Sequence, residues 1–80
     1  MDGPEKHPLI DAAIRRLGSQ GALARAIGSS QSAVSRMLLL EIPISAEVAV
    51  AIERATNREV GRWQLRPDLW DAPPPASEAA

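Results

Sequence analysis

Residues 19–38, SQGALARAIGSSQSAVSRML, place the tightest limits on how this chain can fold. They read as two short helices joined by a tight turn. Ala24 falls midway along the first helix, where a larger side chain would clash with a closely crossing second helix. Gly28 comes four residues later, and glycine takes the left-handed conformation of a sharp turn without a Cβ penalty. We expect Ser29 or Ser30 to cap the second helix by accepting from one of its free N–H groups.

The second of these helices has two faces. Val34, Met37 and Leu38 share one face at i, i+3, i+4 spacing and should pack inward. The opposite face carries hydrogen-bonding side chains, namely Gln31, Ser32, Ser35 and Arg36. Such side chains at the start of a helix that enters a major groove are typical of base reading in DNA. The alternative interpretation is an ordinary helical corner with a solvated polar face.

Further DNA contacts are predicted on the first of the two helices. Gln20 opens the first helix and could donate to a DNA phosphate, and Arg25 could add a charged contact. Solvent exposure is the alternative for both side chains. The complete set of predicted DNA-binding residues is Gln20, Arg25, Ser30, Gln31, Ser32, Ser35 and Arg36.

The charge of the chain supports this interpretation only through its distribution. The net charge of −1 argues mildly against nucleic acid, because many DNA-binding domains are basic. Residues 8–40, however, carry four arginines against one aspartate, a local charge of +3. Most of the remaining acids lie outside this block, so one basic face is expected on a nearly neutral protein.

Apolar periodicity and capping residues predict an all-α domain of four to five helices. The predicted helices cover residues 8–17, 20–27, 31–38 and 46–55, with a last helical turn over 61–65. We expect Val60, Trp63, Leu65 and Trp70 to close the core. The domain organisation is a flexible N-terminus at 1–7, a single domain at 8–71 and a disordered, proline- and alanine-rich tail at 72–80.

Composition narrows the function classes. The chain has no cysteine, which excludes disulfides and thiolate metal sites and is natural in a reducing cytoplasm. His7 is the single histidine, and we expect a surface side chain rather than a metal ligand. Scattered carboxylates and the lack of a glycine-rich phosphate loop predict no catalytic residues, no cofactor and no enzyme. No apolar run is long enough to cross a membrane, so no membrane partner is expected.

The segment 38–44, LLLEIPI, holds more apolar residues than the preceding helix needs. Leu39 and Leu40 fall outside the inward face of that helix, and Pro43 ends any helical continuation. Ile42 and Ile44 could seal the core against the helix at 46–55. Alternatively, the segment could be the interface of a homodimer, because exposed apolar patches on small proteins mark interfaces.

Several motifs, taken together, resemble a known family. They are Gln20 with the following Ala-Leu-Ala-Arg run, Gly28, the Gln31–Ser35 segment, the Ala-Ile-Glu-Arg-Ala-Thr run at 51–56 and the closing Leu-Arg-Pro-Asp-Leu-Trp at 65–70. Over residues 9–71 the chain resembles the Cro-like, YdaS-type helix-turn-helix family of phages, prophages and bacterial chromosomes. The resemblance implies a bundle of four or five helices and a transcriptional regulator, bacterial or phage-encoded and located on the cytoplasmic nucleoid. Some members have been labelled antitoxins.

The resemblance also assigns roles and shows departures. It implies phosphate contacts for Gln20 and Arg25, and base-facing positions for Gln31, Ser32 and Arg36. Where family members often have polar, glycine-containing or basic residues after the recognition helix, this chain has Leu-Leu-Glu at 39–41. Asn-Arg at 57–58 replaces a more usual glycine.

The sequence therefore favours a sequence-specific regulator, a repressor, that binds double-stranded DNA. The alternative is an antitoxin or adaptor that acts mainly by protein–protein binding. The apolar segment 38–44 and the acidic net charge support this second hypothesis.

Overall fold

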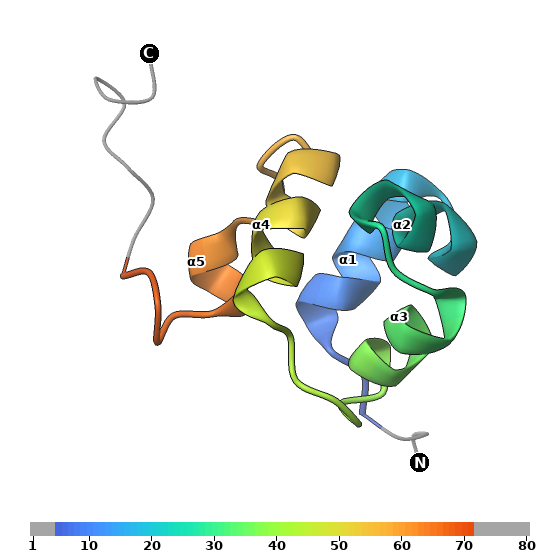
Figure 1. Cartoon of the computed structure of the whole chain (residues 1–80), viewed down its shortest axis with the longest axis horizontal. Helices are drawn as coiled ribbons and strands as arrows, with labels where there is room; N and C mark the ends of the chain where they lie inside the picture. Colours follow the sequence, from blue (N-terminus) through green and yellow to red (C-terminus); the bar gives the residue numbers. More distant parts are fainter. Residues whose placement is uncertain (1–4, 72–80) are drawn as a thin grey trace.

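The structure is a computed structural model that describes residues 5–71 (Figure 1). Five helices follow one another in this part of the chain: α1 (Pro8–Leu17), α2 (Gln20–Ile27), α3 (Gln31–Leu38), α4 (Ala46–Ala55) and α5 (Arg62–Leu65). The all-α prediction is confirmed, and the bounds of α1 to α4 agree with the predicted ones. The predicted tail at 72–80 and the first four residues of the predicted N-terminus lie outside the described residues.

Serine side chains begin the three central helices. The Oγ atoms of Ser19, Ser30 and Ser45 accept from the N–H groups of Ala22, Ala33 and Val48 at 3.0, 3.0 and 3.1 Å. Each bond satisfies one of the N–H groups that a helix start leaves without an intrahelical partner. Of the two serines that the sequence left open, the cap of α3 is therefore Ser30.

Helix α2 lies between its neighbours and packs against α1, α3 and α4. Its inward residues Leu23 and Ala24 are buried, and Ala24 exposes only 4% of its surface. The turn to α3 is made by Gly28 at φ +70, and the N–H of Ser29 donates back to the carbonyl of Ala24 at 2.8 Å. The small side chain and the left-handed glycine thus allow the close crossing that the sequence predicted.

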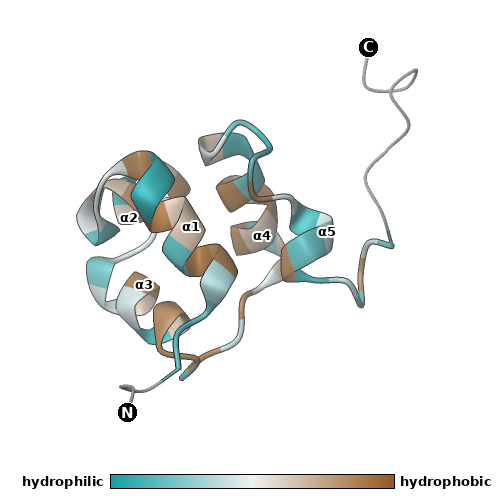
Figure 2. Cartoon of the chain, turned by 180° about the vertical axis from the view of Figure 1, so that it is seen from behind, coloured by the Kyte–Doolittle hydropathy of each residue, from teal (hydrophilic) through white to brown (hydrophobic). Residues whose placement is uncertain are grey.

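The core runs through the middle of the helical assembly, and the apolar stretches of the helices turn toward it (Figure 2). Ile10 of α1, Leu23 of α2, Val34 of α3 and Ile52 of α4 have no exposed surface. Full burial of such side chains contributes about 1.5–3 kcal/mol each relative to exposure. The predicted inward face of α3 is confirmed, because all three of its members are buried.

Helix α5 packs on α4 around one buried carboxylate. Glu53 is only 5% exposed. Its Oε1 accepts from the backbone N–H and the Nε–H of Arg62, and its Oε2 lies 3.2 Å from Nε of Arg58. Burial by itself raises the pKa of the Glu53 carboxyl, but the hydrogen bonds and charges of Arg62 and the charge of Arg58 lower it overall.

The prediction for core closure holds for three of its four residues. Val60 and Leu65 are buried and the half-buried Trp70 packs against the core, whereas the half-buried Trp63 is not among the side chains that pack against it. The rings of Trp63 and Trp70 face the guanidinium groups of Arg58 and Arg62, whose Cζ atoms lie 5.9 and 5.5 Å from the ring centroids. The wide rings therefore cover the ion pairs at the edge of the core, as cation–π partners, instead of filling its centre.

His7 also differs from the prediction of a surface side chain. Its Nδ1 accepts from the N–H of Leu9 at 3.3 Å and caps α1, and its own backbone N–H donates to the carbonyl of Leu38 at 2.7 Å. The imidazole is half-buried, and this burial lowers the pKa of His7. Within residues 5–71, no three potential metal-binding side chains come together. In the same range, no helix is long and apolar enough to cross a membrane.

Candidate nucleic-acid interface

The predicted DNA-binding residues lie on α2 and on α3 with its N-cap, but their exposure differs. Arg25, Gln31, Ser32 and Arg36 are exposed. Arg25 and Arg36 stand in the last turns of α2 and α3, and Gln31 and Ser32 occupy the first turn of α3. These four side chains are accessible to solvent.

The remaining three predicted residues are more constrained. Gln20 and Ser35 are half-buried. Ser30 is exposed, but its hydroxyl oxygen already accepts from the N–H of Ala33. Because a hydroxyl has one donor hydrogen besides its acceptor sites, Ser30 can still donate one hydrogen bond to a phosphate or a base.

Side chains from both helices converge over Gly21. A Cβ atom built on Gly21 would lie 3.7 Å from Nη1 of Arg25, 3.8 Å from Oε1 of Gln31 and 4.0 Å from Oγ of Ser19. The sequence predicted Arg25 and Gln31 separately; the fold places them side by side. It also adds Gly21, which the sequence reasoning missed and over which these two side chains meet.

The arginines of the helix-turn-helix differ in their ion pairs from all the other arginines of residues 5–71 except Arg54. Arg15 and Arg16 of α1 pair with carboxylates of Asp11 and Glu59. Toward the C-terminus, Arg58 and Arg62 share Glu53, and Arg66 binds Asp68. Among residues 5–71, no carboxylate oxygen lies within 4.0 Å of Arg25 or Arg36, so neither charge is neutralised by a close carboxylate.

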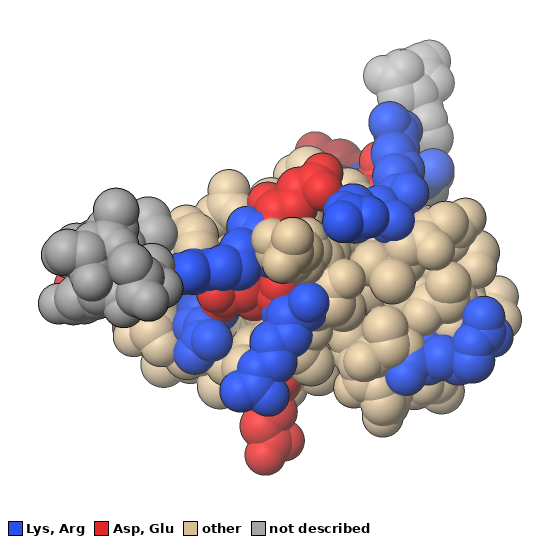
Figure 3. Space-filling view, turned by 90° about the horizontal axis from the view of Figure 1, so that it is seen from above, with Lys and Arg blue, Asp and Glu red and all other residues tan. Residues whose placement is uncertain are grey.

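The acidic residues lie outside the stretch of sequence that carries Arg25 and Arg36. Between Asp11 and Glu41 the chain has no acidic residue. Seen from above, the acidic side chains gather toward the part of the molecule that holds α4 and α5, and the end formed by α2 shows a basic side chain among uncharged ones (Figure 3). The candidate surface on α2 and α3 therefore has a local positive charge.

The segment 38–44 divides between core and surface. Ile44 is buried and Ile42 packs against the core, as the core-sealing interpretation expected. Leu39 and Leu40 are 36% and 52% exposed.

The backbone of Leu40 is left-handed, with φ +64. The N–H of Glu41 donates to the carbonyl of Arg36 at 2.8 Å and the N–H of Leu40 to that of Met37 at 3.2 Å. This is the Schellman pattern of a helix end, in which glycine is the usual left-handed residue. For a residue with a Cβ the left-handed conformation costs about 1–2 kcal/mol.

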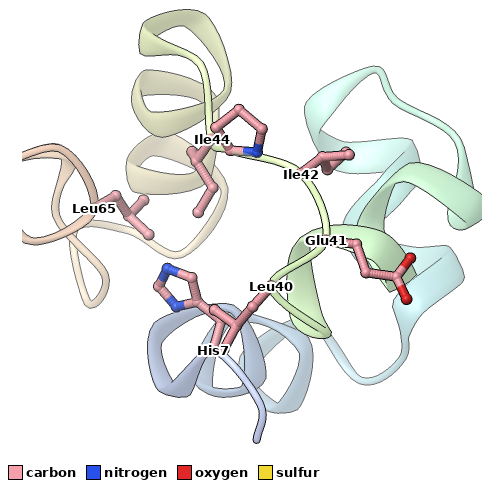
Figure 4. A pocket seen from close by; sticks show the side chains of 7 residues that line it. His7, Leu40, Glu41, Ile42, Ile44 and Leu65 are labelled. Carbon is pink, nitrogen blue, oxygen red and sulfur yellow. The ribbon is translucent and has the colours of Figure 1, made fainter.

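A hollow of about 380 Å³ lies beside Leu40, between the α3–α4 connection and α5. We call it the linker hollow; it is lined by His7, Leu40, Glu41, Ile42, Pro43, Ile44 and Leu65. His7, Ile44 and Leu65 face one another across it, while the Glu41 side chain points away (Figure 4). The hollow is therefore largely apolar, with one imidazole in its wall.

Comparison with known families gives a match over most of the chain. The profile of the family described as "Bacterial toxin YdaS" matches residues 10–74. The chain belongs to this YdaS family. The match covers all the regions on which the resemblance was based, namely the helix-turn-helix, the run at 51–56 and the closing Leu-Arg-Pro-Asp-Leu-Trp segment.

Among solved structures, this YdaS-family chain is similar to the Cro protein of prophage element Xfaso 1 in Xylella fastidiosa strain Ann-1. The two chains are 42% identical, and the match covers 82% of this chain and 100% of the Cro chain with a TM-score of 0.74. The Cro-like helical fold is thereby confirmed. A search of curated proteins found no match.

Proposed function

We propose that this chain is a sequence-specific regulator that binds double-stranded DNA and reads the major groove with α3. In this proposal Gln31, Ser32 and Arg36 contact bases, and Gln20 and Arg25 contact phosphates. Ser30 and Ser35 lie at the edge of the contact and donate hydrogen bonds from their hydroxyls.

The observation that carries the proposal is the pair of arginines without a close carboxylate on an acid-free stretch. Arg25 and Arg36 are exposed and, with Arg54 of α4, make none of the ion pairs of the described residues, whereas Arg15, Arg16, Arg58, Arg62 and Arg66 are each paired with a carboxylate of this chain. Phosphate binding draws its free energy from released counterions, which requires cations that are accessible. The four exposed side chains on α2 and α3 supply both the cations and the hydrogen-bonding groups that base reading needs.

The similarity to a prophage Cro protein supports the same proposal, because the match spans all of that chain. A small domain that covers a major groove competes with other proteins for the same DNA, and we therefore assign repression as the mode of action. Such a regulator works on the nucleoid of a bacterial cytoplasm, encoded by the bacterium or by a phage. The role is one of binding, with no catalytic residue.

A second candidate function is the binding of a protein partner, as an antitoxin or adaptor would do. The observation that favours it is the pair of exposed leucines, Leu39 and Leu40. The family description names a toxin. This description is compatible with a chain that acts by binding another protein. The two candidates differ in salt dependence, because phosphate contacts weaken steeply with salt and apolar contacts do not.

The proposal is tested by selecting bound sequences from a random pool of double-stranded DNA with the purified chain. We expect one enriched motif. On that site, Arg36→Ala should cost about 1–3 kcal/mol of binding free energy and relax the preference at one base position, because a bidentate contact to guanine is lost. Binding is measured by fluorescence anisotropy on the selected duplex and on single-base variants.

Arg54→Ala is the matched control. Arg54 is an exposed arginine in the last turn of α4, outside the helix-turn-helix, and its loss should change neither affinity nor sequence preference. The placement of α3 in the major groove would be wrong if the pool gave no enriched motif. It would also be wrong if Arg36→Ala left both the DNA affinity and the sequence preference unchanged.

A further inference from the structure

The side chains of Arg25 and Gln31 approach each other across the turn between α2 and α3, although they are six positions apart in the sequence. Nη1 of Arg25 and Oε1 of Gln31 lie 3.7 and 3.8 Å from the same point over Gly21. A guanidinium nitrogen only donates hydrogen bonds, and an amide oxygen only accepts them. The atoms that approach one another are therefore a complementary pair.

The fold holds the backbone of both residues in place. Arg25 directly follows the buried Ala24, whose carbonyl accepts from the N–H of Ser29 at 2.8 Å in the turn. Gln31 is the first residue of α3 and directly follows its capping residue, Ser30. Both side chains are exposed, so only their flexible ends remain to be arranged.

The Arg25 guanidinium has N–H donors available for a contact with the amide. A guanidinium carries five N–H donors in a planar fork. Within residues 5–71 the hydrogen bonds from guanidinium groups come from Arg62 and Arg66, and no carboxylate pairs with Arg25. One edge of the fork can therefore bind a DNA phosphate while another N–H reaches the amide of Gln31.

We propose that Arg25 is a positioning residue for base reading, because its guanidinium donates to Oε1 of Gln31 and leaves the amide NH2 to face the base edge. This inference rests on the proposed function, in which Arg25 contacts a phosphate and Gln31 contacts a base. It adds a link between the two contacts. The group that binds the DNA backbone also determines which end of the amide is offered to the groove.

This link determines which base Gln31 selects. A glutamine amide with both ends available pairs with adenine, accepting from N6 and donating to N7. With its oxygen held by Arg25, the amide of Gln31 presents donors alone. Guanine is then the best match, because its N7 and O6 are both acceptors in the major groove, whereas adenine opposes a second donor at N6. We therefore expect guanine at the base position that Gln31 reads.

Selection from a random pool of double-stranded DNA tests the link when it is carried out with the parent and with variants of the full chain. The base position of Gln31 is the one whose preference is lost in Gln31→Ala. There the parent should favour guanine over adenine by about 10-fold, as a bidentate contact would, and Arg25→Ala should favour adenine instead. Because Arg25 is exposed, Arg25→Ala should melt at the temperature of the parent, which separates altered reading from a loss of fold.

Arg25→Lys separates positioning from charge. The lysine ammonium keeps the phosphate contact, so the salt dependence of the affinity should equal that of the parent. The preference should nevertheless move from guanine toward adenine, because a compact ammonium lacks the planar fork that spans phosphate and amide together. An Arg25→Lys chain with the full guanine preference would show that charge alone is sufficient and would overturn the positioning role.

A double-mutant cycle measures the coupling between the two side chains. In the Gln31→Ala background, Arg25→Ala should still weaken binding through the lost phosphate contact but should alter no base preference, so the effects on discrimination are not additive. Arg36→Ala is the matched comparison, since Arg36 lies five residues further along α3. Its loss should relax the preference at its own base position equally in both backgrounds.

The outcomes distinguish the failure of this proposal from the failure of the proposed function. A pool without an enriched motif overturns both. An enriched motif with the same preference in the parent and in Arg25→Ala keeps DNA reading by α3 and overturns the positioning role of Arg25. Two further results have the same consequence: a parent that already selects adenine at the Gln31 position, and a Gln31→Ala chain that loses no base preference.

Discussion

At the scale of single residues, His7 connects three parts of the molecule. Its Nδ1 caps α1, its backbone N–H holds the carbonyl of Leu38 at the end of α3, and its ring lines the linker hollow. As an N-cap acceptor the ring must keep Nδ1 unprotonated. A protonated ring would lose this bond and place a positive charge at the positive end of the α1 dipole.

The stability of the domain should therefore fall in mild acid. Burial lowers the pKa of His7 below its ordinary value of 6.5, so the unfolded chain binds more protons than the folded one between the two pKa values. Stability from this residue is fully present above pH 6.5 and is lost as the pH falls from 6.5 through the folded pKa. Urea unfolding of the parent and of His7→Asn at pH 7.5 and pH 5.5 would measure it.

His7→Asn is the matched variant because asparagine also caps helices but does not titrate. The parent should lose more stability than this variant over the same pH interval. The nearby Glu41 points away from the imidazole and is common to both chains. Equal losses in the two chains would mean that the acid sensitivity comes from carboxylates alone.

Single positions also show where sequence reasoning stops. Ser19, Ser30 and Ser45 are local caps, so their bonds three residues along the chain could be predicted from the sequence. The backbone hydrogen bond from His7 to Leu38 spans 31 positions, and no local sequence pattern predicts it. The left-handed conformation of Leu40 could not be predicted either, because leucine disfavours that conformation.

At the scale of elements, the crossing of α2 and α3 determines how the candidate surface is presented. The side chains of Arg25 and Gln31 come together over Gly21 because α3 crosses α2 closely. The crossing depends on Ala24, which is buried at 4% exposure. The helix bounds could be predicted because each helix has its own start and stop signals, whereas the meeting of these two side chains required the packed pair.

Ala24→Leu should force the two helices apart. Overpacking of this kind costs about 1–3 kcal/mol of unfolding free energy, which lowers the melting temperature of a domain this size by about 4–8 °C per kcal/mol. Thermal melts followed by circular dichroism would measure the change. DNA affinity should fall in parallel, because the recognition helix no longer holds its position relative to Arg25.

Ala26→Leu serves as the control on the same helix. Ala26 is exposed, so the larger side chain extends into water and should alter stability by no more than about 0.5 kcal/mol. If Ala24→Leu had the same melting temperature as Ala26→Leu, α2 and α3 would pack less closely than the burial of Ala24 indicates.

At the scale of the whole molecule, the net charge of −1 is the sum of two parts of the chain that differ in how their arginines are paired with acids. The acid-free stretch on α2 and α3 carries two arginines without close carboxylates, and the C-terminal part pairs Arg58, Arg62 and Arg66 with its own acids. The sequence revealed the local excess of arginine. It did not reveal which arginines are paired, because the partners of Arg16 and Arg62 lie far along the chain.

DNA binding should weaken steeply with salt in spite of the acidic net charge. A plot of log affinity against log salt concentration has a slope of about −0.9 for each phosphate neutralised. Arg25→Ala should reduce the slope by about 1, because Arg25 contacts a phosphate in the proposed complex, and Arg54→Ala should leave it unchanged. A flat plot for the parent would favour the protein-partner candidate over DNA.

The charge cluster around Glu53 makes the C-terminal segment behave as one unit in local opening. Removing Arg58 or Arg62 alone would leave the buried carboxylate short of partners, which is costly. Detaching α5 as a whole instead returns the carboxylate and both guanidinium groups to water together. We therefore expect hydrogen exchange in this segment to proceed by a concerted subglobal opening, while α1 to α4 stay folded around their apolar core.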